Sequence, residues 1–164
     1  MSGGRGARAY VGLGANLGDA RAALLAAVTA LGALPRTRLV NCSSLYRSAP
    51  VDSSGPDYLN AVAEITTALA PHELLAQLQA IELKHGRERP YRNAPRTLDL
   101  DLLLYGHTVL ATPALTLPHP RQHERAFVLL PLAEIAPAVR IPGQASLVDL
   151  LKGVAGQRVD KLGA

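Results

Sequence analysis

The sequence predicts an α+β domain in which helices pack on an antiparallel sheet. Three signals lead to this prediction: apolar runs with strand alternation, apolar positions at helical spacing, and Gly, Pro and Asp residues between them. In chain order they give strand, helix, strand, strand, helix, strand. This order is the split βαβ pattern of a ferredoxin-like fold, with both helices on one face of the sheet and short elements after the βαββαβ core.

Clear start and stop signals bound the first half of this core. Residues 8–13 form a short apolar strand, and Asp19 is a suitable N-cap for a helix that Gly32 and Pro35 end. Residues 37–46 then have the composition of a strand. The predicted buried stripe of the helix consists of Leu24, Leu25, Val28 and Leu31.

The second half repeats the pattern. Residues 58–68 form a strand, Pro71 opens a helix that ends before Gly86, and a strand containing Asp99 follows. The remaining predicted elements are an apolar stretch at Phe127–Ile135, a strand near Val139–Ile141 and a small helix at Leu147–Val154.

A glycine-rich segment, Gly12–Asp19, invites comparison with nucleotide-binding loops. Its spacing differs from theirs, because Leu17 stands where a dinucleotide fingerprint needs glycine, and the Gly-Lys-Ser/Thr ending of a Walker loop is absent. We interpret the segment as a tight strand-to-helix turn, with phosphate binding by its backbone as the minor alternative.

The composition fits one domain over residues 1–164. A chain of 164 residues with 48% hydrophobic residues can bury a single core, and no apolar run reaches the ~18 residues of a membrane span. The first residues lack the apolar segment of a secretory signal, so we expect a cytoplasmic protein without membrane contact. Cys42 is the only cysteine, which excludes an internal disulfide, and we expect it in the core.

The net charge of +4 indicates an anionic partner. An RNA-binding sheet needs stacking aromatic residues, but this chain has no Trp, one Phe and five Tyr, so we expect no nucleic-acid partner. A compact anion held with a metal fits better. Two basic clusters flank a pair of aspartates: Lys84, Arg87, Arg89, Arg92 and Arg96 before it, and His119, Arg121, His123 and Arg125 after it.

That pair, Asp99 and Asp101, is the strongest candidate metal site. Side chains alternate along a strand, so the two carboxylates share one face while Leu98, Leu100 and Leu102 point into the core. One or two carboxylates together with substrate phosphates are the usual ligands of Mg²⁺. A solvated polar face on a half-buried strand is the more frequent explanation of a bare Asp-x-Asp pattern, so the spacing alone does not establish a metal site.

Several motifs in the same order resemble those of the 6-hydroxymethyl-7,8-dihydropterin pyrophosphokinase family of folate synthesis. The resemblance covers Tyr10–Pro137. It implies transfer of the pyrophosphoryl group of ATP to the hydroxymethyl group of a reduced pterin, leaving AMP. The motifs are Tyr58–Ala61, Gln79–Glu82, Gly86–Arg89, Ala94–Asp101, Leu117–Pro120 and Arg125–Phe127.

The resemblance also implies residue roles. Two Mg²⁺ ions are bound by Asp99 and Asp101, which act in catalysis with Arg87 and Arg96. The residues implied in ATP binding are Gln79, Glu82, Arg87, Arg89, Arg96, His119 and Arg125, and those implied in pterin binding are Ser48, Val51, Tyr58, Asn60 and Phe127.

The chain departs from many members of that family in lacking the Trp that precedes Gly-Pro-Arg, where it has Arg92–Arg96. We expect a monomer. Two rival functions remain: an RNA-binding module, which predicts salt-sensitive binding without metal, and a regulatory domain, which predicts ligand binding without ATP turnover.

Overall fold

The computed structural model describes residues 6–16, 19–49, 57–85 and 98–162. Within them, one antiparallel sheet organises the fold, beside a separate two-stranded ribbon. The strands are β1 (Ala7–Ala15), β2 (Thr37–Cys42), β3 (Tyr46–Ser48), β4 (Tyr58–Thr67), β5 (Asp99–Tyr105), β6 (Leu110–Ala111), β7 (Thr116–Leu117) and β8 (Val159–Lys161). The sheet runs β5-β1-β4-β3-β8, with β2 also paired to β4, and β6 and β7 form the ribbon. The predicted α+β class with an antiparallel sheet is confirmed.

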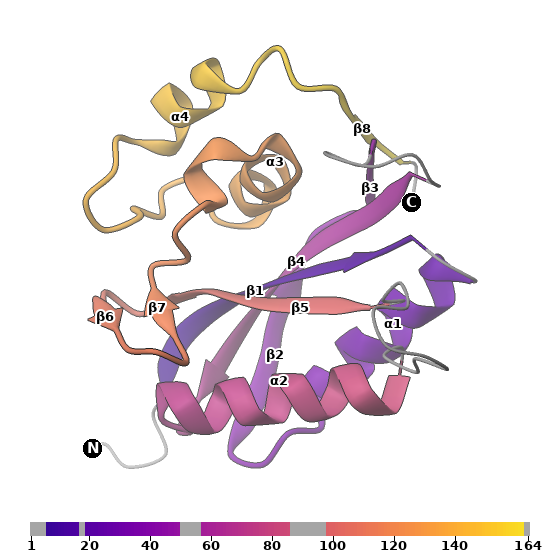
Figure 1. The fold of residues 1–164 in the computed structure, drawn as a ribbon, viewed down its shortest axis with the longest axis vertical. Coiled ribbons are helices and arrows are strands. Elements are labelled where there is room, and N and C mark those ends of the chain that lie inside the picture. Colours follow the sequence, from indigo (N-terminus) through magenta and orange to yellow (C-terminus); the bar gives the residue numbers. More distant parts are fainter. Residues whose placement is uncertain (1–5, 17–18, 50–56, 86–97, 163–164) are drawn as a thin grey trace.

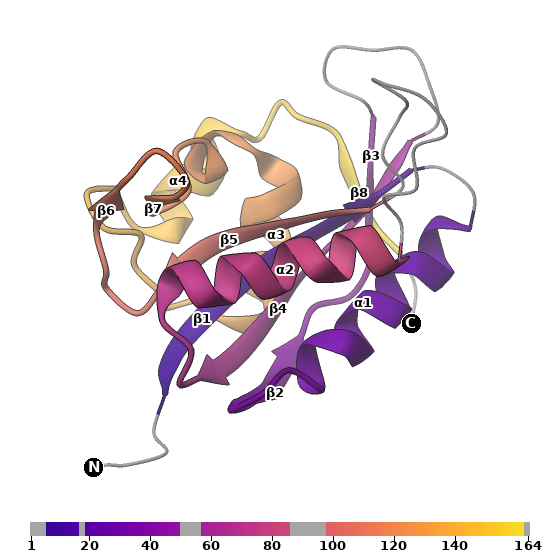
Figure 2. The same ribbon diagram turned by 60° about the horizontal axis from the view of Figure 1, so that its bottom comes forward.

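Helices cover both faces of the sheet. Figures 1 and 2 show α1 and α2 together on one face, as predicted, while α3 lies on the opposite face and α4 packs beside α3. The prediction placed only short elements after the core and did not include a helix on the second face of the sheet. The helices are α1 (Ala20–Gly32), α2 (Pro71–His85), α3 (Ala126–Ile135) and α4 (Leu147–Gly153), with a short 3₁₀ helix, η1, at Gln122–Glu124.

The start of α1 follows from its cap. The Asp19 carboxylate accepts a hydrogen bond from the backbone N–H of Ala22 at 3.0 Å, satisfying a donor that has no partner inside the helix. Leu24 and Leu31 are fully buried against the sheet, as predicted. The prediction for Leu25 was wrong: its side chain is 53% exposed, because the stripe is narrower than the spacing indicated.

Strand β5 contacts both cores by alternation, and a β-bulge adds one more residue to the second core. Leu100 and Leu102 face the core under α1 and α2, as predicted, as does Leu98 just before the strand. The register of β5 with β1 shifts between Tyr10 and Val11. Leu103 and Leu104 consequently both belong to the second core, under α3.

The second core forms where α3 crosses β4 and β5. Leu129 and Leu132 of the helix are fully buried against Val62 and Leu103 of the sheet. The apolar stretch predicted at Phe127–Ile135 is therefore this helix.

Two predicted strands differ in the structure. Residues 37–46 are divided into β2 and β3, because the Ser43 hydroxyl accepts from the N–H of Val62 and replaces one ladder contact at the break. No strand forms at Val139–Ile141: Val139 N–H donates to the carbonyl of Ala136 in a turn. Cys42, expected in the core, is only half-buried in β2.

A carboxylate on α3 joins this helix to β3 and to the residues just before it. Glu134 accepts hydrogen bonds from the Ser44 hydroxyl and the Tyr46 hydroxyl, both at 2.8 Å, and from the Ser44 N–H at 3.0 Å. Burial raises the pKa of Glu134, but these hydrogen bonds and the charge of Lys161 outweigh it and leave the pKa below its usual value. Burial of the Tyr46 hydroxyl and its hydrogen bond to the Glu134 carboxylate raise the pKa of Tyr46.

No helix in the described ranges combines the length and apolarity that crossing a bilayer requires.

Candidate active site

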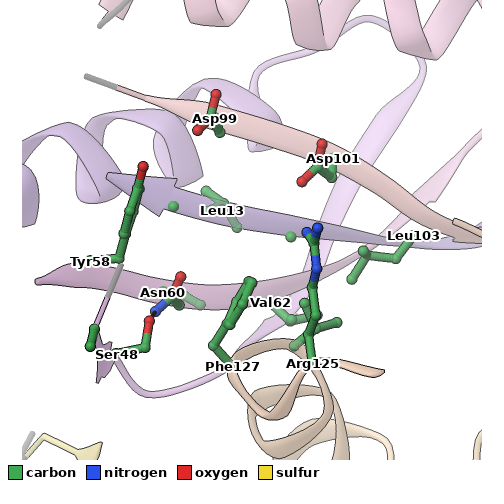
Figure 3. A pocket seen from close by; sticks show the side chains of 15 residues that line it. Leu13, Ser48, Tyr58, Asn60, Val62, Asp99, Asp101, Leu103, Arg125 and Phe127 are labelled. Carbon is green, nitrogen blue, oxygen red and sulfur yellow. Dashed lines mark hydrogen bonds between the residues drawn. The ribbon is translucent and has the colours of Figure 1, made fainter. Parts of the chain in front are cut away.

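A pocket opens on the sheet face that carries α3, over the first halves of β5 and β4 and the end of β1 (Figure 3). Its cavity volume is about 310 Å³, in the lower range for small-molecule sites. Acidic side chains stand on the β5 side, and aromatic and amide side chains stand on the β4 and α3 side. The lining residues are Gly12, Leu13, Gly14, Ser48, Ala49, Tyr58, Asn60, Ala61, Val62, Asp99, Asp101, Leu103, Arg125, Phe127 and Val128.

The acidic pair faces this pocket from the edge of the sheet. Asp99 and Asp101 alternate with buried leucines and line the same cavity, so the prediction of a shared face is confirmed. The strand register places Asp99 opposite Gly14 and Asp101 opposite Gly12 on β1. Both carboxylates therefore stand at one wall of a floor made largely of backbone.

Gly12 and Gly14 make that floor. The interpretation of Gly12–Asp19 as a turn was wrong for its first residues, since both glycines lie inside β1 and pair with β4 and β5. A Cβ atom at Gly14 would lie 3.5 Å from the Asn60 side-chain oxygen, inside the cavity. The missing side chains thus leave open the space between Asp99 and Asn60.

The opposite wall combines a polar edge with aromatic rings. The Asn60 side-chain N–H donates to the Ser48 hydroxyl at 2.8 Å, and both side chains are buried. Tyr58 and Phe127 stand on either side of Asn60 in Figure 3. Four of the five residues predicted for pterin binding therefore meet here, and the fifth, Val51, lies outside the described residues.

A cation lies between the ring and the acidic pair. The Arg125 guanidinium is 5.5 Å from the centroid of the Phe127 ring, within the range of a cation–π interaction. Figure 3 shows the Arg125 side chain extending from the start of α3 toward Asp101. Arg125 therefore sits beside both the ring face and the acidic wall.

His119 lies just behind this wall. Its backbone N–H donates to the carbonyl of Leu103 at 3.0 Å. Its ring Nδ1 accepts from the backbone N–H of Arg121 at 3.2 Å. An accepting Nδ1 places the proton of the neutral ring on Nε2. Burial lowers the pKa of His119, the Asp101 carboxylate opposes this shift, and Arg125 and Arg121 add to it, so the ring is neutral near pH 7.

Two residues predicted to bind ATP take different places on α2. Gln79 is exposed and does not line the pocket. Glu82 is only 6% exposed, and its carboxylate accepts from the N–H of Leu100 at 2.8 Å, between the two aspartates. Its observed contact is thus with the backbone that carries the acidic pair.

Three further predicted residues, Arg87, Arg89 and Arg96, lie outside the described residues. In the part of the chain that is described, no group of three or more His, Cys, Asp or Glu side chains forms a metal cage. An oxygen donor pair such as Asp99 and Asp101 instead suits an ion that takes its remaining ligands from water and substrate phosphates.

Sequence reasoning did not predict the glycine floor of the pocket or its apolar lining by Leu103 and Val62. Leu103 continues the face of Asp99 and Asp101 by strand alternation, and Val62 reaches the pocket through the pairing of β4 with β1. A local signal existed for the floor, since glycines two residues apart in an otherwise apolar strand indicate a close approach of another group.

Comparison with known proteins gives consistent matches. Residues 10–137 match the family model described as 7,8-dihydro-6-hydroxymethylpterin-pyrophosphokinase. The chain is 47% identical to a 2-amino-4-hydroxy-6-hydroxymethyldihydropteridine pyrophosphokinase of Pseudomonas aeruginosa, over 94% of this chain and 96% of the relative. It is 44% identical to the protein of the same name from Haemophilus influenzae, over 94% and 97%.

A solved structure with a similar fold is more distant in sequence. The wild-type HPPK-DHPS of Plasmodium falciparum with pteroate superposes with a TM-score of 0.69 at 14% identity, covering 93% of this chain. The chain spans 43% of that larger protein. At this identity the likeness concerns the fold alone.

Proposed function

We propose, from the premise that this chain belongs to the 7,8-dihydro-6-hydroxymethylpterin-pyrophosphokinase family, that the pocket between Asp99 and Phe127 is where its reaction occurs. The chain is a pyrophosphokinase of folate biosynthesis that transfers a pyrophosphoryl group to hydroxymethyldihydropterin. ATP is the proposed donor. One observation supports the assignment above all: the strand register sets an acidic pair and a flat, amide-edged wall at opposite sides of one glycine floor.

The pterin occupies the Phe127 side of the pocket in this proposal. A flat heterocycle stacks on Phe127 and Tyr58, while Asn60, fixed by its bond to Ser48, reads the donors and acceptors of the ring edge. The glycine floor admits the ring close to the sheet. This orientation directs the hydroxymethyl group toward the acidic wall.

The triphosphate occupies the acidic and basic side. The pterin hydroxymethyl oxygen bonds to the β-phosphorus, the bond from that phosphorus to the α,β-bridging oxygen breaks, AMP leaves with that oxygen, and the hydroxyl proton passes to solvent water. Such a transfer is accelerated by positioning and by neutralising charge on the phosphate oxygens. Arg125 supplies one cation from the start of α3, and Arg87, Arg89 and Arg96 are proposed to supply others.

Asp99 and Asp101 fit Mg²⁺ by the chemistry of their donors. Two carboxylates on one strand face offer the hard oxygen ligands that Mg²⁺ would take, and substrate phosphates and water would supply the others. We propose that they hold two ions. Bound Mg²⁺ supplies charge neutralisation at the phosphates and favours the ionised form of the attacking hydroxyl.

His119 is proposed as a neutral hydrogen-bond donor to a phosphate oxygen. Its lowered pKa and its accepting Nδ1 both support Nε2–H as the group it offers. Donation from a neutral ring positions the leaving group without adding charge.

The expectation of a monomer in the cytoplasm stays a prediction.

One assay tests the function. Incubation with ATP, Mg²⁺ and 6-hydroxymethyl-7,8-dihydropterin should yield AMP and the pterin pyrophosphate in equal amounts. Omission of Mg²⁺ should stop the reaction. Binding of the pterin without AMP formation would instead support a regulatory domain, and metal-independent, salt-sensitive RNA binding would support the nucleic-acid alternative.

A further inference from the structure

Gln157 holds the backbone on both sides of a pocket residue. Its side-chain oxygen accepts from the N–H of Ala126 at 2.9 Å, and its side-chain N–H₂ donates to the carbonyl of Glu124 at 2.8 Å. The two bonded groups flank Arg125. Arg125 is also the N-cap of α3, and its own side chain makes no capping hydrogen bond. Gln157, from the segment between α4 and β8, therefore does the capping from a distance.

The chain before Arg125 is held by a second side-chain amide, that of Gln122. Gln122 is fully buried, and its side-chain N–H₂ donates to the carbonyl of Leu103 at 2.9 Å, beside the N–H of His119 on the same oxygen. The segment that contains His119, Arg125 and Phe127 is thus joined to the β5 bulge at one end and to Gln157 at the other.

We propose that Gln157 is a positioning residue: by fixing the backbone around Arg125, it presents the Arg125 guanidinium and the Phe127 ring to the pocket in one prepared arrangement. The inference rests on the proposed function of this pocket. A prepared arrangement does not have to be ordered when the substrate binds, so it raises affinity and the rate of reaction.

Stability alone does not account for this contact. α3 is anchored by Leu129 and Leu132, which are fully buried, whereas Gln157 is exposed. The bond to Glu124 is exposed and the bond to Ala126 is part-buried, so together they add the modest stability of a helix cap to a helix that is already packed. Its two bonds act where the helix begins, which is the part of α3 that reaches the pocket.

The test compares two variants at Gln157. Gln157→Met keeps the length of the side chain and removes both bonds, while Gln157→Glu keeps an acceptor for Ala126 and loses the donor. For Gln157→Met we expect kcat/KM for the pterin to fall about three- to tenfold, mainly through a higher KM, with a small fall in Tm of the kind that loss of a helix cap produces. Gln157→Glu should fall between this variant and the wild type.

Ser146→Ala is the matched control, because Ser146 also caps a helix with its side chain, accepting from the N–H of Asp149 in α4, away from the pocket. It should lower Tm slightly and leave KM unchanged. Wild-type KM and kcat/KM in Gln157→Met, or an equal KM shift in Ser146→Ala, would overturn the inference.

A second readout separates this inference from the proposed function. Amide hydrogen exchange at Ala126 and Phe127 should speed up in Gln157→Met and stay unchanged in Ser146→Ala, whatever the turnover. Unchanged exchange in Gln157→Met would overturn the positioning role. A wild-type protein that forms no AMP with the pterin would count against the proposed function, and with it against the inference.

Discussion

Replacing Gly14 by Ala should stabilise the free protein and weaken pterin binding. In the free structure an added Cβ would lie 3.5 Å from the Asn60 side-chain oxygen, 3.9 Å from the Leu59 carbonyl and 4.0 Å from the Tyr58 ring. These are ordinary van der Waals contacts, so nothing has to move. The new methyl group would nevertheless occupy the floor on which we place the ring.

The two effects have opposite signs and different sizes. Glycine in a strand costs roughly 0.5–1 kcal/mol relative to alanine, so the variant should melt about 1–4 °C higher. A bound ring that rests on the sheet at Gly14 would meet the methyl group as overpacking. Overpacking typically costs about 1–3 kcal/mol, which corresponds to roughly a 5- to 160-fold weaker Kd for the pterin.

The assay is titration of the pterin in the presence of Mg²⁺ and a non-hydrolysable ATP analogue, together with a thermal melt. Gly153→Ala is the control, since a Cβ at this α4 position meets nothing within 4 Å and lies away from the pocket. It should raise Tm without changing pterin affinity. Unchanged pterin affinity in Gly14→Ala would refute our placement of the ring over β1.

Three further predictions concern the walls of the pocket and the α3 anchor. Asp99→Asn and Asp101→Asn should each lower turnover by about 10²-fold or more with an unchanged Tm, and near-normal Mg²⁺-dependent AMP formation in both would contradict the metal assignment. Phe127→Leu should weaken pterin binding by ~1 kcal/mol in a titration and leave ATP affinity and Tm nearly unchanged; an unaltered pterin affinity would remove Phe127 from the site. The depressed pKa of Glu134 contributes stability above its unfolded-state pKa that is lost as pH falls through the folded-state pKa. Glu134→Gln should therefore show a flatter loss of stability in urea unfolding between neutral pH and about pH 3, and a wild-type acid profile would contradict this reasoning.

Local periodicity was enough to predict much of the fold and the acidic wall. Alternation along one strand determines that Asp99 and Asp101 share a face, and caps such as Asp19 determine where helices begin. The resemblance to a family added the opposite wall, because nothing local connects Asn60 with Phe127. The acidic pair and the residues of the opposite wall come together only because β1 lies between β5 and β4 in the sheet.

What the sequence did not predict depends on contacts between distant segments. The β5 bulge, which turns Leu103 and Leu104 to the same core, is a property of pairing with β1 and leaves no mark on β5 itself. The role of Gln157 depends equally on distance, since its partners lie about thirty residues earlier in the chain. A glutamine in a polar segment carries no signal of such a contact.

The position of β5 at the edge of the sheet explains why Glu82 is buried. An edge strand leaves backbone groups without a neighbouring strand, and such groups need partners when they are buried. The Leu100 N–H, between the two aspartates, donates to Glu82, and the Leu103 carbonyl accepts from Gln122 and His119. The Glu82 side chain from α2, and the Gln122 side chain and His119 backbone N–H from the segment before α3, thus replace a missing strand along β5. These contacts fix the backbone that holds the acidic pair, so a change at Glu82 acts on the reaction through β5 as well as through any contact with ATP.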